Sequence, residues 1–359
     1  MLKICSLDNK TEWDNIVKSF NDYDIYYLSG YAKLYFLHGD GIPLLIYFNN
    51  DKVKAINVVL KRDITESQYF YGYIEKNIYF DFITPYGYGG FIIENQNNEE
   101  QQINEVDIIE LKEEYEGFCQ ENNIISEFVR FHPLIRNYRY MSLLYDLTKI
   151  GNTISVDLTD ADNLWANFSS KNRNMCRKAI KNGVKIEHSS DKVIIEEFIS
   201  LYNKTMDRDN ADKYYYFDKN YYYTLFNEFG KNAEIFYALY NERIISAAII
   251  FYTNKYMHYH LSGSASSFKH LAPTNLLLYE VALWGHKMGF EVFHLGGGVG
   301  GSEDNLYKFK KSFNRNEDNP FYIGKKIYNK SIYEKLVNIR MKESTFDKES
   351  NFFPLYRSE

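Results

Sequence analysis

Runs of apolar residues separated by polar turns predict both strands and helices in the first half of the chain. The runs 43–48 and 53–60 flank the polar turn 49–51 and predict two paired strands. Apolar residues spaced by three and four predict helices over 11–20 and 30–37. Further strands are predicted at 77–83 and 125–131, with an acidic segment at 99–116 that becomes amphipathic. This order of elements is typical of an α+β fold.

The second half repeats this order of helices, hairpin strands, a long helix and a last strand. Its predicted helices are 164–180, 192–206, 219–229 and 274–288, and its predicted strands are 184–188, 235–240, 244–252 and 256–262. No residue-level repeat accompanies the similarity, which therefore rests on element order alone. We predict two domains, 1–150 and 151–325, followed by a segment, 326–359, that packs back on the first.

The stretch 290–313 carries the strongest candidate chemistry. Residues 291–295 predict a short buried strand, and 296–301 are all glycine except Val299, so this backbone can turn sharply and expose its amides. Ser302 is the predicted N-cap of the helix that follows. Leu306, Phe309 and Phe313 predict the inward face of that helix, and Lys310 lies on the same face. An inward lysine after a glycine loop is a candidate site residue, although it could also extend past an apolar patch to reach solvent.

A dinucleotide-binding loop is the alternative interpretation of these glycines. Gly296, Gly298 and Gly301 satisfy the pattern G-x-G-x-x-G after a strand. Too little chain follows to complete a doubly wound sheet, and no acidic ribose partner is recognisable. We therefore do not expect a nicotinamide or flavin cofactor.

Composition limits the remaining possibilities. The net charge of −6 argues against DNA as a partner but allows a local basic patch. The 34 Tyr and 26 Phe are partly expected from AT-rich coding, so they are poor evidence for a sugar-binding surface. The three cysteines form no disulfide or zinc pattern, and we find no signal peptide or membrane-spanning run. We expect a cytoplasmic protein that binds no metal, with peripheral membrane contact left open.

Three polar clusters add candidates for ligand binding. Arg173 and Arg177 share one face of a basic helix whose other side Trp165 and Phe168 should anchor, which suits a phosphate-bearing ligand or an RNA acceptor stem as well as a solvated surface. The second cluster is a charged, tyrosine-rich loop at 207–216. In the third, His258 and His260 should share a strand face, where a polar wall of His260, Ser262 and Ser264 is a better explanation than a metal site.

Several of these motifs together resemble the FemAB-like acyltransferases. The resemblance is dense over 160–325 and thinner before 150, where DFITPYGYGG (81–90) is the best match. The matching motifs are SSKNRNMCRKAIKNGV (169–184), TMDRDNADKYYYF (205–217), YHLSGS (259–264), LAPTNLLLYEVALWGHKMG (271–289), FHLGGG (293–298) and LYKFKKSF (306–313).

The resemblance implies two domains of the N-acetyltransferase (GNAT) fold in tandem, with mixed sheets flanked by helices. Family members transfer an acyl group, often an amino acid from aminoacyl-tRNA, to an amine of a peptidoglycan or surface-polysaccharide precursor. The lysine of the family's F-K-x-x-F motif falls on Lys310, as the group that stabilises the oxyanion, and the phosphate-binding arginines fall on Arg173 and Arg177. The other substrate-binding candidates in these motifs are Arg208, Tyr216, Tyr259, His260, Ser262, Asn275, Gly297, Gly298, Phe309 and, in the first half, Tyr86.

The sequence also departs from related patterns. GNAT enzymes that use acyl-CoA carry a loop of the type Q/R-x-x-G-x-G/A for the pyrophosphate. The corresponding segment here, SASSFKHLAPTN (264–275), lacks this loop, and the first half offers only a partial match at Thr84, Gly87 and Gly89. The long coiled-coil arm of some family members is also absent.

We therefore expect an acyltransferase that forms an amide on an amine of a cell-envelope precursor, a muropeptide or amino sugar linked to a nucleotide or lipid diphosphate. The donor would be aminoacyl-tRNA or acyl-CoA, and no further cofactor is needed. The alternatives are a CoA-dependent N-acetyltransferase acting on a nucleotide amino sugar and a non-catalytic GNAT-like protein that binds a similar ligand. The sequence does not identify the acyl group.

Overall fold

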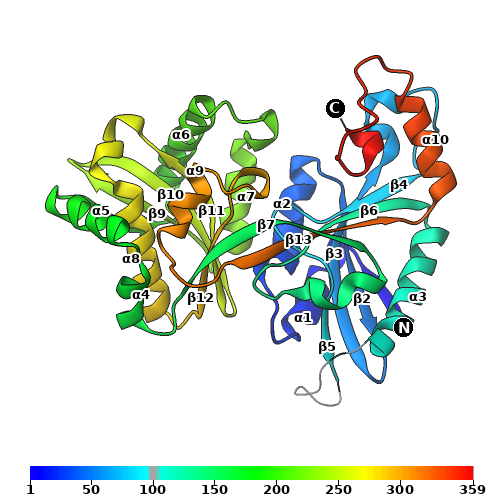
Figure 1. Ribbon diagram of the computed structural model, residues 1–359, viewed down its shortest axis with the longest axis horizontal. Coiled ribbons are helices and arrows are strands. Elements are labelled where there is room, and N and C mark those ends of the chain that lie inside the picture. Colours follow the sequence, from blue (N-terminus) through cyan, green and yellow to red (C-terminus); the bar gives the residue numbers. More distant parts are fainter. Residues whose placement is uncertain (97–102, 104, 359) are drawn as a thin grey trace. The chain divides into compact units, whose positions relative to one another are not determined.

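The computed structural model divides the chain into two compact units. It describes residues 1–96, 103 and 105–358, so part of the acidic segment 99–116 and the last residue of the segment 326–359 lie outside the described residues. The first unit comprises Met1–Ile150 and Phe321–Glu359, and the second comprises Gly151–Pro320 (Figure 1). Both boundaries fall inside strands, β7 (Asp146–Asp157) and β13 (Asn319–Ile327), so the boundary predicted at 325 lies within β13.

The first unit builds one mixed sheet in the order β1-β2-β3-β4-β6-β13, with β5 paired to β3. Its further strands are β1 (Leu2–Cys5), β2 (Ile42–Asn49), β3 (Val53–Asp63), β4 (Phe80–Ile83), β5 (Ile92–Asn95) and β6 (Ile124–Arg130), and its helices are α1 (Lys10–Lys18), α2 (Ser29–His38), α3 (Glu105–Glu121) and α10 (Lys330–Arg340). Ile108, Leu111 and Tyr115 of α3 are buried, as the amphipathic pattern predicts. They pack with apolar residues of β2, β3 and β6 in one core cluster.

The second unit builds a sheet in the order β7-β12-β11-β10-β9-β8. Its further strands are β8 (Lys185–Ser189), β9 (Ala233–Tyr240), β10 (Arg243–Thr253), β11 (Tyr256–Ser264) and β12 (Val292–Gly296), and its helices are α4 (Ala161–Asn167), α5 (Ser170–Lys181), α6 (Lys192–Arg208), α7 (Lys219–Phe229), α8 (Pro273–Lys287) and α9 (Asn305–Lys311). On one face, Ile250 packs with Leu277 and Val281 of α8. Its neighbour Phe251 points to the other face and contacts Phe229 of α7, so helices cover both faces (Figure 1).

The two sheets follow the same series of pairings. In the first unit β1, β2, β3 and β4 pair antiparallel, β4 pairs with β6 in parallel, and β6 pairs with β13 antiparallel. In the second unit β8, β9, β10 and β11 pair antiparallel, β11 pairs with β12 in parallel, and β12 pairs with β7 antiparallel. A helix links the strands of each parallel pair, α3 in one unit and α8 in the other. The predicted α+β class with mixed sheets and flanking helices is confirmed.

The predicted helix 164–180 is wrong as a single element. Phe168 has an extended backbone (φ −70°, ψ 143°) that ends α4, and Ser169 then caps α5 through the backbone N–H of Asn172. The apolar periodicity continues across this break because Leu164, Phe168 and Cys176 are all buried. The pattern therefore detects the shared buried face but not the change of direction. The short strands β1 and β5 and the long strand β7 were not predicted.

A buried carboxyl group lies in the core of the first unit. Glu127 of β6 is 1% exposed, and its Oε2 accepts hydrogen bonds from the hydroxyls of Tyr115 (3.1 Å), Tyr145 (3.1 Å) and Tyr328 (2.6 Å). Burial raises the pKa of Glu127 to about 7, although these hydroxyl donors favour the charged form and oppose the rise. The group therefore changes charge near neutral pH inside a packed core.

Glu127→Gln is expected to change the pH dependence of stability. Since the folded-state pKa of about 7 exceeds the ordinary 4.5, the folded chain binds more protons between these values, and the free energy of unfolding falls as pH rises through them. The loss at pH 8 is about 3 kcal/mol. Urea unfolding of Glu127→Gln should show a flatter pH profile and higher stability at pH 8, whereas the exposed control Glu113→Gln should match the wild type. Equal pH profiles for wild type and Glu127→Gln would contradict this assignment.

The C-terminal segment is fixed to the first unit by a second buried carboxylate. Asp81 of β4 is 0% exposed and accepts hydrogen bonds from Arg62 Nε at 2.7 Å, the Tyr356 hydroxyl at 3.0 Å and Arg357 Nε. Burial alone would raise the pKa of Asp81, but the charges of Arg357 and Arg62 outweigh burial and lower it. Arg340 of α10 donates to the carbonyl of Ser358 at 2.8 Å. Residues 355–358 are therefore part of the folded core.

Candidate active site

The site develops where two parallel strands of the second unit cease to pair. β11 and β12 pair over only three residues each, from the pair Tyr256 and Val292 to the pair His258 and His294. β11 then continues to Ser264, while β12 ends at Gly296 and leads into the glycine loop. Beyond His258, β11 and β12 no longer share ladder hydrogen bonds. Backbone groups of this kind need other partners, and a bound acyl group or amide can provide them.

Two glycines of the loop are required by close backbone approach. A Cβ on Gly298 would overlap the carbonyl of Ser302 and a carboxylate oxygen of Asp304, and one on Gly297 would lie 2.8 Å from the carbonyl of Asn152. The loop therefore folds tightly against the start of α9 and against β7. Side chains at these two positions would push the loop outward.

Asp304 holds the loop and begins the helix. Its carboxylate accepts hydrogen bonds from the backbone N–H of Tyr307 (2.8 Å) and of Val299 (3.2 Å). The Tyr307 N–H holds the pKa of Asp304 below its usual range. The predicted N-cap Ser302 is wrong, because its hydroxyl donates to the carbonyl of Val299 at 2.8 Å and α9 begins three residues later. Asp304 connects loop and helix, which makes it a positioning residue that sequence reasoning missed.

Lys310 is directed inward, as helical spacing predicted. The residue is 8% exposed, and its Nζ donates a hydrogen bond to the carbonyl of Gly297 at 2.7 Å. Burial lowers the pKa of Lys310 to about 8, while the charge of Asp304 opposes this. The ammonium has three N–H donors, of which the Gly297 carbonyl uses one. The loop and the helix together place a desolvated cation beside the end of β12.

The predicted inward face of α9 needs one correction. Leu306 is 41% exposed, and Tyr307 is buried in its place because the helix begins at Asn305. The hydroxyl of Tyr307 donates a hydrogen bond to Asp318. Phe313 is buried, and Phe309 packs edge-on against it with ring centroids 5.3 Å apart. The face therefore passes through Tyr307 and Lys310 and ends at Phe313.

The two arginines of α5 face α4 rather than pointing away from it. Arg173 Nη1 donates to the carbonyl of Phe168 at 2.7 Å. It thereby supplies a hydrogen-bond donor to a carbonyl at the C-terminal end of α4, which has no partner within the helix. Arg177 lies over the ring of Trp165, 5.2 Å from its centroid, and donates to Asn174 at 3.1 Å. Trp165 thus contacts the basic face, whereas the sequence predicted it on the opposite side. The break between α4 and α5 brings the tryptophan under the arginine.

A bulge in β11 separates residues that were predicted to share a face. Tyr259 pairs with Ile250 and Leu261 with Ile249, so His260 is an extra residue in β11. The Tyr259 hydroxyl donates to Ser262 Oγ at 2.7 Å, which shows that these two side chains meet. The predicted wall of His260, Ser262 and Ser264 is therefore wrong. Alternation fails at the bulge, and the sequence carries no signal for it.

His260 is held in an aromatic environment. Its ring stacks on Phe251 with centroids 4.2 Å apart, and its Nε2 lies 3.3 Å from the Tyr221 hydroxyl. Burial, with a smaller contribution from His258, lowers the pKa of His260 to about 3. The ring is thus neutral at physiological pH and can orient a ligand without supplying charge.

The remaining candidates occupy three places. Arg208 Nη1 donates to the carbonyl of Ser264 at 2.8 Å, at the end of β11, while the hydroxyl of Tyr216 donates to Asp207 at 2.9 Å. Asn275 on the first turn of α8 donates to Asn172 of α5 at 2.7 Å and joins these helices. Tyr86 belongs to the first unit, where its carbonyl accepts a hydrogen bond from a tyrosine hydroxyl.

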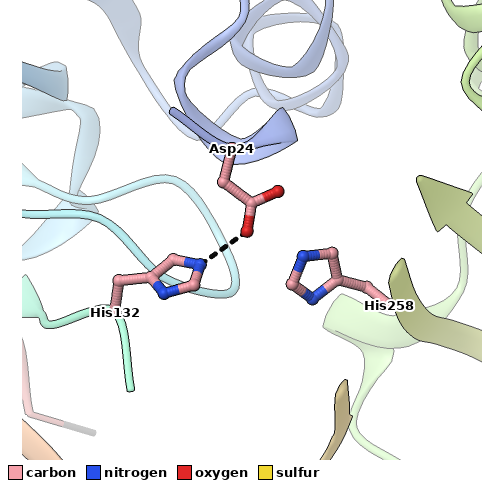
Figure 2. Close-up of side chains that lie close together, drawn as sticks. All are labelled: Asp24, His132 and His258. Carbon is pink, nitrogen blue, oxygen red and sulfur yellow. Dashed lines mark hydrogen bonds and ion pairs between the residues drawn. The ribbon is translucent and has the colours of Figure 1, made fainter. Parts of the chain in front are cut away.

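The first unit contains a buried pair that sequence reasoning missed. Asp24 and His132 are both 0% exposed, and His132 Nε2 lies 2.7 Å from Asp24 Oδ2 (Figure 2). The backbone N–H of Ile135 lies 3.2 Å from His132 Nδ1, so Nδ1 accepts and Nε2–H donates to the carboxylate. The two residues are 108 positions apart, and no local pattern connects them. Among the described residues, neither unit alone holds three His, Cys, Asp or Glu side chains close enough to share a metal ion.

A family model matches the part of the chain that carries this geometry. The FemAB family matches residues 148–243 and 238–317, which include Lys310, the glycine loop and α5. The matched residues span almost all of the second unit. The FemAB match indicates an acyltransferase, so the predicted class of enzyme is confirmed.

Solved structures show the same fold at low sequence identity. FemX is 15% identical, with a TM-score of 0.66, and the match covers 93% of this chain and 99% of FemX. The C-terminal domain of a putative lysylphosphatidylglycerol synthetase from Agrobacterium fabrum is 13% identical, with a TM-score of 0.54, over 93% of this chain and 95% of that domain. No curated protein matches the sequence. These two matches show that the α+β fold with two equivalent mixed sheets is shared with FemX and with that domain.

Among the residues that the structure describes, no helix combines the length and the apolar composition that crossing a bilayer requires.

Proposed function

We propose that the protein transfers an aminoacyl group from aminoacyl-tRNA to an amine of a peptidoglycan precursor carrying a nucleotide or lipid diphosphate. The observation that carries this proposal is the buried ammonium of Lys310, 2.7 Å from the Gly297 carbonyl beside strands that no longer pair. The FemAB match over the second unit supports the reaction class. The segment before α8, Ser266–Leu271, forms a 3-10 helix, which gives no support for an acyl-CoA pyrophosphate loop.

The reaction needs no protein nucleophile. The amine nitrogen attacks the ester carbonyl, a C–N bond forms, and the carbonyl oxygen becomes negatively charged. The C–O bond to the tRNA then breaks, the 3′ hydroxyl leaves with a proton, and the nitrogen loses one. Lys310, with a pKa of about 8, is mostly protonated at pH 7, and its two remaining N–H donors stabilise the oxyanion. Orientation of donor and acceptor supplies the rest of the rate enhancement.

The diphosphate of the acceptor is assigned to the basic face of α5. Arg177 is exposed and lies over the ring of Trp165, so its guanidinium is oriented before a phosphate arrives. Arg173 contributes charge, but its guanidinium already donates to the carbonyls of Trp165, Ala166 and Phe168. We assign the work to the cytoplasmic side of the membrane, where such precursors and charged tRNA are both available.

Arg177→Ala is expected to raise KM for the acceptor about tenfold with kcat nearly unchanged, because it removes a charge-assisted contact that ground state and transition state share. Lys181→Ala, an exposed lysine at the end of the same helix, is the control and should change KM little. Melting temperatures should be unchanged for both. A KM equal to that of the wild type in Arg177→Ala would contradict the assignment, and Arg173→Ala is less suitable because it also frees the end of α4.

The acceptor amine is tested by mass spectrometry. The enzyme would be incubated with aminoacyl-tRNA and a UDP-linked muropeptide, and fragmentation would locate any added residue. We expect one amino acid on the free amine and none on an N-acetylated acceptor. Addition to the N-acetylated acceptor at the same rate, or no addition with any charged tRNA, would overturn the proposal.

A further inference from the structure

A cavity of about 140 Å³ in the first unit is lined by charged residues and by residues of the strand β5. Arg136 and Arg139 contribute from the loop after β6, and Phe91 to Glu94 contribute from β5 and the residue before it. Asp22 and Glu94 are also in the lining. Lys54 Nζ lies 3.1 Å from Glu94 Oε2 and compensates the charge of that carboxylate. The positive charge of the two arginines therefore exceeds the negative charge of Asp22.

Neither guanidinium has a partner within the part of the chain that the structure describes. Arg136 is half-buried and Arg139 is exposed, yet the hydrogen bonds that the structure gives them are made by their backbones. An exposed arginine without a partner is ordinary. A half-buried arginine lining a cavity without one is a donor array that an anion can satisfy.

The backbone of Arg136 has a strained conformation. Its φ of 55° and ψ of 35° place it in the left-handed region, which is unfavourable for residues with a Cβ. Of the eight non-glycine residues with positive φ in the described chain, five are asparagine, which tolerates this region. Arginine gains nothing locally here, and glycine would fit better. Strained backbone of this kind is found at ligand-binding sites, so the position of Arg136 beside the cavity is consistent with a binding role for its side chain.

The loop that carries the arginines is fixed rather than mobile. Asn137 is buried, and its Nδ2 donates to the carbonyls of Gly89 at 2.9 Å and Phe91 at 3.1 Å. These bonds tie the loop to the start of β5. Arg136 and Arg139 are thus held at a set distance from the strand edge.

The edge of β5 identifies the class of ligand. β5 pairs with β3 on one side, and no described strand pairs with its other side. Such an edge offers backbone N–H and C=O groups to an extended chain. A peptide lying along β5 would place its end in the cavity, where two arginines suit a carboxylate.

We propose that this cavity binds the C-terminal carboxylate of an extended peptide. Arg136 and Arg139 hold the carboxylate, and the free edge of β5 holds the preceding residues. The proposal does not rest on the proposed function, since binding to the first unit is measured directly and requires no turnover.

The test uses the full-length protein and two synthetic ligands, N-acetyl-alanyl-alanine and its C-terminal amide. Titration calorimetry at low salt should show the free acid binding at least tenfold more tightly than the amide, and more tightly than inorganic phosphate. Arg136→Gln and Arg136→Gly should each weaken binding of the acid about tenfold or more. Arg315→Gln, an exposed arginine of the second unit, is the control and should bind as the wild type does.

Arg136→Gly separates binding from folding. Glycine removes the strain of the left-handed backbone, so its melting temperature should equal or exceed that of the wild type by about 2–4 °C while binding is lost. Equal affinity for acid and amide, equal affinity for phosphate, unchanged affinity in both Arg136 variants, or no binding of the acid at millimolar concentration would each overturn the proposal.

Discussion

Lys310→Met is expected to lower kcat by about 10²–10³-fold while the KM values for donor and acceptor change little. The loss corresponds to the removal of one preorganised donor to the oxyanion, typically about 3–4 kcal/mol. Methionine resembles lysine in length and lacks only the ammonium, so the packing of α9 is largely retained. The matched control is Lys308→Met on the exposed face of the same helix, which should keep full activity.

Lys310→Met should also be at least as stable as the wild type at pH 7. Because burial lowers the folded-state pKa of Lys310 to about 8 from 10.5, the unfolded chain binds more protons between these values. The free energy of unfolding therefore rises from pH 8 to 10.5, and below pH 8 the folded state carries the full cost, about 3 kcal/mol. Methionine removes this cost but leaves the Gly297 carbonyl without its donor. A large loss of stability at pH 7 with unchanged kcat would show that Lys310 is only structural.

Asp81→Ala is expected to destabilise the first unit by about 3–5 kcal/mol, because it leaves the half-buried Arg62 and Arg357 without their carboxylate. Urea unfolding and tryptic release of the C-terminal segment would measure the effect. Glu334→Ala is the control, since its pair with Lys330 is exposed and contributes about 0.5 kcal/mol or less. Equal stability of Asp81→Ala and the control would contradict this account of the segment.

The pH dependence has a definite sign for Asp81. The pKa of this carboxyl is lowered in the folded state, so its contribution is present above the unfolded value of 3.8 and is lost as pH falls below it. The wild type should therefore lose stability in acid more steeply than Asp81→Ala.

Periodic patterns predicted the parts of the site that lie within one element. Lys310 was found because helical spacing over seven residues sets which side chains face inward, and that spacing depends only on local geometry. The α+β class followed in the same way from the order of strands and helices. The N-cap of α9 was missed by two positions, because Ser302 and Asp304 are both good N-caps and tertiary contacts with Val299 decide between them.

Features that depend on pairing between distant segments were not predictable. The break at Phe168 places Trp165 beneath Arg177. The extra residue His260 changes which side chains of β11 lie on the same face of the sheet. Asp24 and His132 meet only after the sheet of the first unit has formed. In each case the sequence contains the residues, but a long-range contact selects their arrangement.

Aminoacyl transfer from tRNA is tested directly by following transfer of label by the purified protein. It would be incubated with labelled aminoacyl-tRNA or labelled acetyl-CoA, in the presence and absence of a UDP-linked muropeptide. We expect label to pass from tRNA to the muropeptide, no label on the protein when the acceptor is omitted, and transfer at least 100-fold slower with Lys310→Met. Label passing only from acetyl-CoA, label retained on the protein, or equal rates for wild type and Lys310→Met would contradict it.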